Sequence, residues 1–304
     1  MTRVLPRALL PYAAVALAAG SWGAWALVIR HAEAIAPMPA ALESTIVMAV
    51  ITVVAGLASL RDRAAAPRTW KAWACVGWFG IADLFNVLLF FAAYKLTIAV
   101  AVLTHYLTPV FVALMAPLVL REKMTVRTGL AIAVSFFGLA VMLAPSGPGA
   151  SATVVWTSAA LGSASAVFYA SNVLVNKFVV GAFSTSQAMF WHGVVATLVG
   201  LAMVPPGAWT AVDPHAVGFL AVVAIGPGAL GGLAFVWGLR RMPAAHASTL
   251  TLLEPVVSLV LGAGVLGERV GALAVLGGAL ILTGAVLVMT QARPAIVTSE
   301  QAAE

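Results

Sequence analysis

Three carboxylates interrupt long apolar stretches of this sequence: Glu43, Asp83 and Glu254. A charged group at the centre of a bilayer costs about 2.5 to 3.5 kcal/mol on insertion scales, so such residues usually bind a substrate, carry a proton or pair with a partner. Asp83 and Asn86 are three residues apart and therefore share one helix face. Their spacing predicts a site for an amine or a proton.

Structural roles compete with these functional interpretations. A neutral, buried Asp83 carboxyl would act as a hydrogen-bonded tie between helices. His105 and His192 lie about two turns inside apolar stretches, where a histidine either titrates near neutral pH or stays neutral and hydrogen bonded. Asn172 is expected either to face substrate or to join two helices by a hydrogen bond. The sequence leaves these alternatives open.

Aromatic side chains also lie within the apolar stretches. Trp22 and Trp25, with Tyr106 and Tyr169, are far enough from the span ends to line a cavity. There they would hold an aromatic or amphipathic substrate by stacking or cation–π contact. Helix packing is the competing explanation for each of them. Trp22 is our candidate for substrate binding.

Prolines and glycines mark places where helices are expected to bend. Pro109 and Pro255 occupy equivalent positions in two similar stretches, and Glu254 directly precedes Pro255. Proline cannot donate to the helical ladder and clashes with the carbonyl four residues earlier. The carbonyl released in this way either binds a ligand or is satisfied by a neighbouring hydroxyl. Gly228 and Gly232 have the small-residue spacing of closely packed membrane helices and predict a bending segment.

The composition is that of a polytopic membrane protein. Of the 304 residues, 62% are hydrophobic and 9% are charged, whereas soluble domains carry about 25% charged residues. At roughly 20 residues a span, about ten helices fit, and the unbroken apolar stretches lack the alternating pattern of a β-barrel. The single Cys75 has no partner for a disulfide or a metal site, and no metal or other cofactor is expected.

An internal repeat organises the chain. Residues 96–143 recur 146 positions later, as residues 242–289, without a gap. The aligned identities include Leu107 with Leu253, Pro109 with Pro255, Glu122 with Glu268, and Gly138 with Gly284. Such a repeat predicts two halves of five helices each, and an odd number of crossings inverts one half relative to the other. The predicted fold class is an all-α integral membrane protein with ten transmembrane helices in two inverted five-helix repeats.

The predicted spans follow from the apolar stretches. They are residues 9–29, 37–60, 71–94, 97–120, 125–144, 153–176, 184–204, 216–239, 244–266 and 270–290. The first repeat covers 9–143 and the second covers 153–290. Between them, 144–152 form an uncharged linker rich in Pro, Gly and Ser, and 291–304 form a polar tail that we expect to be disordered and cytoplasmic. A cleaved signal peptide competes with the first span, but the apolar stretch extends past the cleavage position.

Basic residues are distributed asymmetrically. With the N-terminus inside, thirteen of the 16 Lys and Arg residues fall at cytoplasmic ends of the predicted spans, and only Arg30, Lys95 and Arg269 fall on the other side. This pattern predicts that both termini are cytoplasmic, in the inner membrane of the cell. It also explains the formal net charge of +6 without a nucleic acid partner. Inverted repeats usually enclose a substrate site near the midplane, which is reached by alternating access.

The repeated motifs resemble those of a known transporter family. The first copy has Thr108-Pro109-Val110-Phe111, then Leu118 to Glu122, Gly129 and Gly138; the second has Glu254-Pro255-Val256-Val257, then Gly267-Glu268-Arg269, Gly277 and Gly284. This pattern is similar to the repeat of the EamA family in the drug/metabolite transporter superfamily, over 9–143 and 153–290. The resemblance implies two inverted five-helix repeats and transport, often export, of small metabolites such as amino acids. Many relatives carry an Arg early in the second span, where this chain has Glu43.

These features predict a secondary active transporter that exports small amphipathic metabolites from a lipid-embedded site, with protons as the candidate coupling ion through Asp83 or Glu254. The chain has no Walker lysine pattern for ATP hydrolysis and no His-Glu-x-x-His or Gly-x-Ser-x-Gly motif of an enzyme. A flippase for lipids or lipid-linked sugars is the alternative within transport. A membrane receptor or scaffold that transports nothing is the alternative from another class. Whether the protein is a monomer or a homodimer is left open.

Overall fold

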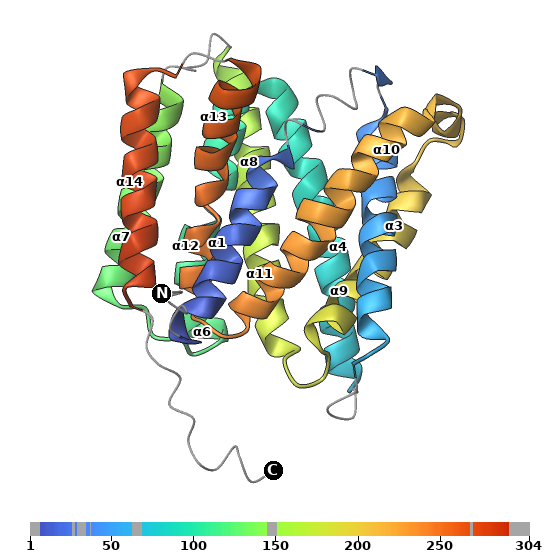
Figure 1. Cartoon of the computed structure of the whole chain (residues 1–304), viewed down its shortest axis with the longest axis horizontal. Helices are drawn as coiled ribbons and strands as arrows, with labels where there is room; N and C mark the ends of the chain where they lie inside the picture. The colour runs from blue at the N-terminus through green and yellow to red at the C-terminus, as the bar shows by residue number, and fades with distance from the viewer. Residues whose placement is uncertain are drawn as a thin grey trace, which may run out of the picture.

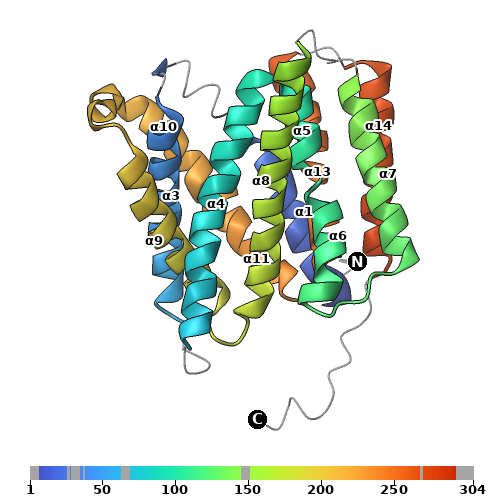
Figure 2. The ribbon, with the colours of Figure 1, turned by 180° about the vertical axis from the view of Figure 1, so that it is seen from behind.

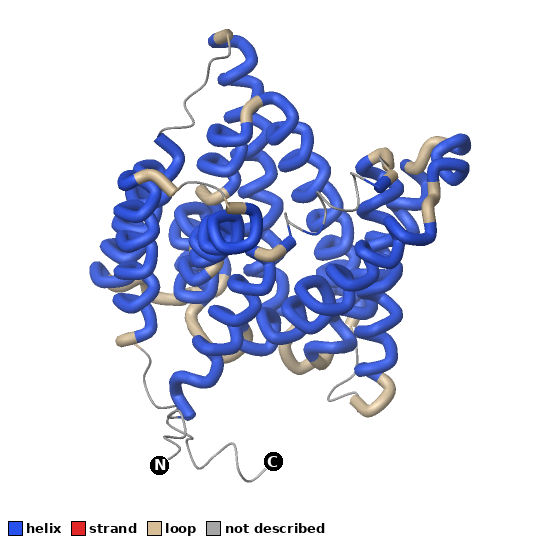
Figure 3. Tube along the Cα trace, turned by 45° about the horizontal axis from the view of Figure 1, so that its top comes forward, coloured by secondary structure: helices blue, strands red, loops and turns tan. Residues whose placement is uncertain are grey.

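The computed structural model describes residues 7–25, 28, 35–36, 38–62, 69–144, 151–267 and 270–291. Helices form all the regular structure in this part of the chain, and it contains no strand (Figure 3). Of the predicted tail 291–304, the description includes only Gln291, and the predicted linker is described only at residues 144, 151 and 152.

Long helices cross the bundle from end to end, and other crossings are made by two or three shorter helices in succession (Figure 1). The first half contains η1 (Arg7–Leu9), α1 (Leu10–Gly23), α3 (Ala40–Ser59), α4 (Trp70–Leu96), α5 (Ile98–His105), α6 (Thr108–Val119) and α7 (Val126–Leu143). The second half contains α8 (Ala152–Phe178), α9 (Thr185–Met203), η3 (Pro206–Ala211), α10 (Pro214–Val223), η4 (Ala224–Gly231), α11 (Gly232–Leu239), α12 (Ala244–Leu250), α13 (Leu253–Leu266) and α14 (Ala272–Met289).

Nine helical stretches of the described chain are long and apolar enough to cross a bilayer. They correspond to the second to tenth predicted spans. Helix α1, in the first predicted span, has 14 residues, and residues 26–27 and 29–34 lie outside the description. A multi-pass membrane protein is therefore shown, whereas the total of ten crossings stays a prediction.

Two spans are divided near their middle, at the positions of the two prolines. The helix ends after His105 and resumes at Thr108, and it ends after Leu250 and resumes at Leu253. The His105 carbonyl accepts the Thr108 hydroxyl at 2.8 Å, and the Thr251 carbonyl accepts the backbone N–H of Glu254 at 3.0 Å. Both released carbonyls are thus satisfied by neighbouring residues, which favours the structural explanation of these bends.

Helices α7 and α14, which correspond to each other in the two halves, pack together and run in opposite directions. A Cβ on Gly138 of α7 would lie 2.7 Å from the Gly277 carbonyl of α14, and a Cβ on Gly284 would lie 2.7 Å from the Ala131 carbonyl. The offset of 146 residues exchanges these two contacts, because it relates Ala131 to Gly277 and Gly138 to Gly284. The seam between α7 and α14 is therefore antiparallel and symmetric. Figure 2 shows this pair at one side of the bundle, with α5 and α6 between it and the pair formed by α4 and α8.

One end of the bundle carries most of the described Lys and Arg residues, and we call it the basic end. It comprises the starts of α1, α4, α7, α9 and α12 and the ends of α3, α6, α8, α11 and α14, at the bottom of Figure 1. Its basic residues are Arg7, Arg61, Lys71, Arg121, Lys123, Arg127, Lys177, Arg240 and Arg241. The start of α1 and the end of α14 therefore lie on the same side of the bundle (Figure 1).

Candidate functional site

A cavity of about 280 Å³ lies between the two halves of the chain. Helices α1, α3, α4 and α5 of the first half and α8, α9, η4, α11 and α13 of the second half contribute its walls. Eight residues singled out from the sequence line it: Trp22, Asp83, Asn86, His105, Asn172, Gly228, Gly232 and Glu254. The fold thus gathers in one place residues that are spread over most of the sequence.

Asp83, on α4, is held by two side chains from the second half. Its Oδ2 lies 2.9 Å from His192 Nε2 on α9, and its Oδ1 accepts a hydrogen bond from Asn172 Nδ2 on α8 at 3.3 Å. The Asp83 side chain keeps 20% of its surface exposed, against 4% for His192. Asp83 is therefore both anchored to the opposite half and open to the cavity.

His192 is the cavity residue that the sequence analysis did not rank among the main candidates. Its ring stacks on Phe79 of α4, with centroids 4.0 Å apart and planes 19° apart, and its Nδ1 lies 3.4 Å from the Met189 carbonyl. The contact of its Nε2 with Asp83 therefore joins α9 to α4 through two side chains that both reach the cavity. His105 and His192 lie at a similar depth in their predicted spans, and the contacts of neither can be read from the sequence.

Asn86, three residues after Asp83 on α4, belongs to a second group of hydrogen-bonded polar side chains. The Ser165 hydroxyl of α8 lies 2.9 Å from Asn86 Oδ1 and 2.8 Å from the Asn86 carbonyl, and His105 Nδ1 lies 2.9 Å from the same hydroxyl. Since Ser165 has one hydroxyl hydrogen, donation to Asn86 makes His105 Nδ1 the donor. The His105 ring stacks on Tyr169, with centroids 5.7 Å apart. The amide oxygen of Asn86 is thus occupied within the protein.

Glu254 brings the second carboxylate to the cavity, from the first turn of α13. Its carboxyl interacts with the side chain of Tyr106, at the break between α5 and α6. Helix α1 packs directly against this turn, because a Cβ on Gly23 would lie 2.7 Å from the Glu254 carbonyl oxygen. A negative charge in the first turn of a helix is favourable to the helix dipole. The Glu254 carboxylate therefore faces the cavity from a well-determined position.

Aromatic rings form much of the remaining wall. Trp22 donates its Nε1–H to the Pro227 carbonyl of η4 at 2.9 Å and contacts Phe235, with centroids 5.1 Å apart. Its polar edge is thus used in the fold, and its ring is available to the cavity. The other aromatic residues of the wall are Trp25, Phe79, Phe90, Phe91, Tyr169 and Phe235.

Gly228 and Gly232 also reach the cavity, where their lack of a side chain admits neighbouring helices. A Cβ on Gly228 would lie 2.8 Å from Ile51 Cδ1 of α3, and one on Gly232 would lie 2.8 Å from Met189 Cε of α9. Pro227 lies in the π-helical segment η4. These contacts explain the small residues by close packing, and the predicted bending of this segment stays a prediction.

Three other predicted residues do not line the cavity: Glu43, Pro109 and Pro255. Glu43 lies in the first turn of α3 and is 7% exposed. The sequence placed all three carboxylates at membrane depth, but only Asp83 and Glu254 share a cavity. Depth along a helix is readable from the sequence, whereas the direction of a side chain around an apolar helix is not.

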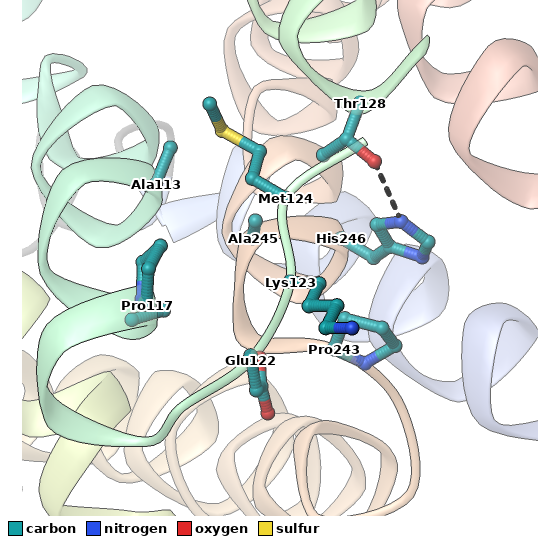
Figure 4. A pocket seen from close by; sticks show the side chains of 10 residues that line it. Ala113, Pro117, Glu122, Lys123, Met124, Thr128, Pro243, Ala245 and His246 are labelled. Carbon is teal, nitrogen blue, oxygen red and sulfur yellow. Dashed lines mark hydrogen bonds between the residues drawn. The ribbon is translucent and has the colours of Figure 1, made fainter. Parts of the chain in front are cut away.

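Hydrogen bonds tie the helix ends together at the basic end, away from the cavity. Glu122, after α6, pairs with Lys177 of α8 and accepts the backbone N–H of Ala244 at 2.7 Å. His246 of α12 contacts the Tyr12 hydroxyl at 2.8 Å and the Thr128 hydroxyl at 3.0 Å. Figure 4 shows the side chains of Glu122, Thr128 and His246 around a pocket of about 10 Å³, which is too small for a substrate.

The basic end also contains Arg240, just after α11. Arg240 Nη1 donates to the Phe183 carbonyl at 2.8 Å, which joins the end of α11 to the loop between α8 and α9. Burial lowers the pKa of Arg240 to about 10, with a smaller contribution from Arg241. The guanidinium remains charged at neutral pH and contributes to the positive charge of this end.

Comparisons with known proteins show the family. The model of the EamA-like transporter family matches the chain twice, over residues 9–144 and 156–290. The chain belongs to the EamA-like transporter family. The resemblance inferred from the repeated motifs is thereby confirmed, and with it membership of the drug/metabolite transporter superfamily.

Other comparisons concern the fold of this EamA-like protein. A chain of known crystal structure has the same fold with a TM-score of 0.76 at 21% sequence identity, and the match covers 94% of this chain and 97% of that one. At this identity the likeness shows the fold alone. No curated protein sequence matches the chain significantly. The family implies a membrane transporter of small molecules.

Proposed function

We propose that this EamA-like protein is a secondary active transporter that exports small amphipathic metabolites, such as amino acids and related compounds, from the cytoplasm. The observation that carries the proposal is Asp83: its carboxylate is open to a cavity between the halves and is held by His192 and Asn172 of the opposite half. A movement of one half against the other changes these contacts directly. This arrangement is suited to alternating access.

The side of the membrane follows from charge. The basic end carries nine of the described Lys and Arg residues, so we place it in the cytoplasm of a cell with an inner membrane, together with both termini. The ties formed by Glu122, Lys177 and His246 then close the cytoplasmic side below the cavity. On this placement, we propose that substrate leaves the cavity on the side away from the basic end.

Protons are the coupling ion that the cavity chemistry favours. Asp83 and His192 share a contact of 2.9 Å, so binding of a proton removes net negative charge from the pair. A positively charged substrate group and a proton would then compete for Asp83. Such competition couples outward movement of substrate to inward movement of protons. Glu254 supplies the other carboxylate through which a proton could pass.

Counterflow in liposomes tests this function. Purified protein would be reconstituted, loaded with a mixture of amino acids and amines, and assayed for uptake of each labelled compound with and without a pH gradient. We expect uptake of at least one compound, stimulation by the gradient, and loss of uptake in Asp83→Asn. Normal transport by both Asp83→Asn and Glu254→Gln with unchanged pH dependence would exclude the proton role, and silence of all compounds would favour a receptor or scaffold.

The size of the cavity favours a metabolite over the flippase alternative. About 280 Å³ lies just below the range of roughly 300 to 1,000 Å³ that is usual for small-molecule sites. A lipid-linked sugar is far larger than such a space. Scrambling of labelled lipid in the same liposomes at rates above those of empty vesicles would support the flippase instead.

A further inference from the structure

We infer that the cavity selects organic cations: molecules with one amine or ammonium group on a flat aromatic body and without a carboxylate. The inference rests on the proposed transport function and narrows its substrate class: among the small amphipathic metabolites it selects amines over amino acids. Its support comes from buried acceptor atoms of the wall that lack a partner, from the charges of the lining residues, and from the aromatic surface between them.

Acceptors without partners lie in the cavity wall. The amide oxygens of Asn172 and Asn176 are buried and accept no hydrogen bond from the described residues. Their amide nitrogens donate to Asp83 Oδ1 at 3.3 Å and to the Asn172 carbonyl at 3.1 Å, which fixes the orientation of both amides. A buried polar atom without a partner costs about 1 to 3 kcal/mol. A ligand that donates N–H groups would remove this cost.

Asp83 adds a charged acceptor beside these amides. Its carboxylate accepts one bond from Asn172 and contacts His192, while a carboxylate offers about four acceptor positions. With 20% of its side chain exposed, Asp83 has room for a ligand donor. Asp83 and the two amide oxygens therefore form a set of acceptors suited to an ammonium group, which has three donors and no acceptor.

The described part of the cavity wall offers no Lys or Arg to a substrate carboxylate. Its charged acidic residues are Asp83 and Glu254. The histidines are engaged with protein partners, His192 with Asp83 and His105 with Ser165. Lys177 pairs with Glu122 at the basic end. A zwitterion or an anion would thus bring its carboxylate into a negatively charged site.

The starts of broken helices are another place where membrane transporters bind carboxylates. Here the first turn of α13 already contains Glu254, whose own charge would repel a second carboxylate. At the start of α6, Pro109 has no N–H, and the Thr108 hydroxyl donates to the His105 carbonyl. Neither helix start is therefore suited to a substrate carboxylate.

Aromatic side chains of the cavity wall add a preference for a flat, positively charged molecule. Trp25, Phe90, Phe91 and Phe235 line the same cavity, together with Tyr169. Their faces attract a cation and stack on a flat apolar body. In a volume of about 280 Å³ the two kinds of contact can be met by one small molecule. An arylalkylamine combines both.

Three indole compounds of similar size and different charge test the inference. Tryptamine is a cation, L-tryptophan a zwitterion and indole-3-propionate an anion at pH 7. Binding to the purified full-length protein in detergent would be measured by displacement of radiolabelled tryptamine. We expect saturable binding of tryptamine, at least tenfold weaker binding of L-tryptophan, and no measurable binding of indole-3-propionate.

Variants connect this preference to the acceptor set. Asp83→Asn should weaken tryptamine binding at least tenfold, whereas Asp83→Glu should keep the order of the three ligands. Asn176→Leu should weaken tryptamine binding severalfold, because it removes one acceptor of the set; its melting temperature is measured alongside, since the bond to the Asn172 carbonyl is lost as well. Asp213→Asn is the matched control: Asp213 caps α10 outside the cavity, and Asn is an equally good cap.

Each outcome of the ligand series decides the inference. Equal or tighter binding of L-tryptophan or of indole-3-propionate would overturn it, as would saturable binding of none of the three by folded protein. Counterflow in liposomes separates it from the transport proposal. Tryptamine that binds but is not transported would refute transport and leave the selectivity standing, whereas transport of L-tryptophan without any preference for tryptamine would do the reverse.

Discussion

The two halves of the chain differ most in the span that corresponds to α4. In the first half this span is one continuous helix that carries Asp83 and Asn86. In the second half it is divided into α10, the π-helix η4 and α11, and the equivalent positions are Ala229 and Gly232. The repeat thus forms an equivalent span in both halves, but only the first half carries the polar pair in it.

In the fourth span of each half, it is the second half that carries the carboxylate. Here both halves are broken at a proline, but the first half has Thr108 before the proline and the second half has Glu254. Each half therefore contributes one carboxylate to the cavity, from non-equivalent spans. By contrast, the seam between α7 and α14 remains symmetric. The packing of α7 against α14 is therefore symmetric between the two halves, whereas the polar residues of the cavity are not.

The largest loss of transport is expected from Asp83, the charged residue that the second half lacks at the equivalent position. Asp83→Asn removes a charged acceptor that His192 and Asn172 hold in place. Because hydrogen bonds to charged groups contribute about 1.5 to 3 kcal/mol, we expect counterflow to fall by at least about tenfold. Transport of any identified substrate at the wild-type rate would show that the polar site of the first half is only structural.

Moving the carboxylate to the second half should not restore activity. In the double variant Asp83→Ala with Ala229→Asp, the new carboxylate would lie at a fully buried position in η4, outside the cavity lining. An unpaired buried charge is strongly destabilising. We expect a lower melting temperature and no counterflow. Recovery of transport would mean that the carboxylate can be carried by the third span of either half.

Substitution of a glycine in the symmetric seam between α7 and α14 should lower the stability of the protein. Gly277→Ala brings a Cβ to within 2.6 Å of Met142 Cβ, between two backbones that have no room to separate. Overpacking of this kind costs about 1 to 3 kcal/mol, so the melting temperature should fall. Gly129→Ala in α7, the other helix of the seam, is the control, because a Cβ there meets nothing within 4 Å. Equal melting temperatures for both variants would contradict the close seam.

The smallest effect is expected at the prolines, where both halves are alike. Thr108→Val removes the hydroxyl that caps the His105 carbonyl, a bond of about 1 kcal/mol. We expect slight destabilisation and nearly normal counterflow. Glu254→Gln, at the equivalent position, should reduce counterflow severalfold. If Thr108→Val impaired transport as much as Glu254→Gln, the polar groups at the two breaks would be functionally equivalent.

Much of this architecture could be predicted because a bilayer restricts the choices. Apolar stretches gave the spans, the repeat gave the antiparallel seam, and rare polar residues gave Asp83, Asn172 and Glu254 as cavity residues. The direction of Glu43 could not be predicted, because an apolar helix has no polar face to orient it. The contact of His192 with Asp83 depends on how α4, α8 and α9 pack, and no local pattern encodes that packing.

The central claim is that the halves enclose one cavity that opens to one side at a time. The single Cys75 permits a direct measurement: Cys75→Ser with Val87→Cys places one thiol in the cavity wall. A membrane-impermeant maleimide applied to cells should label this thiol from the outside, and an excess of substrate should slow the labelling. Labelling of Lys123→Cys from the outside, or of Val87→Cys only from the cytoplasm in every condition, would contradict the account.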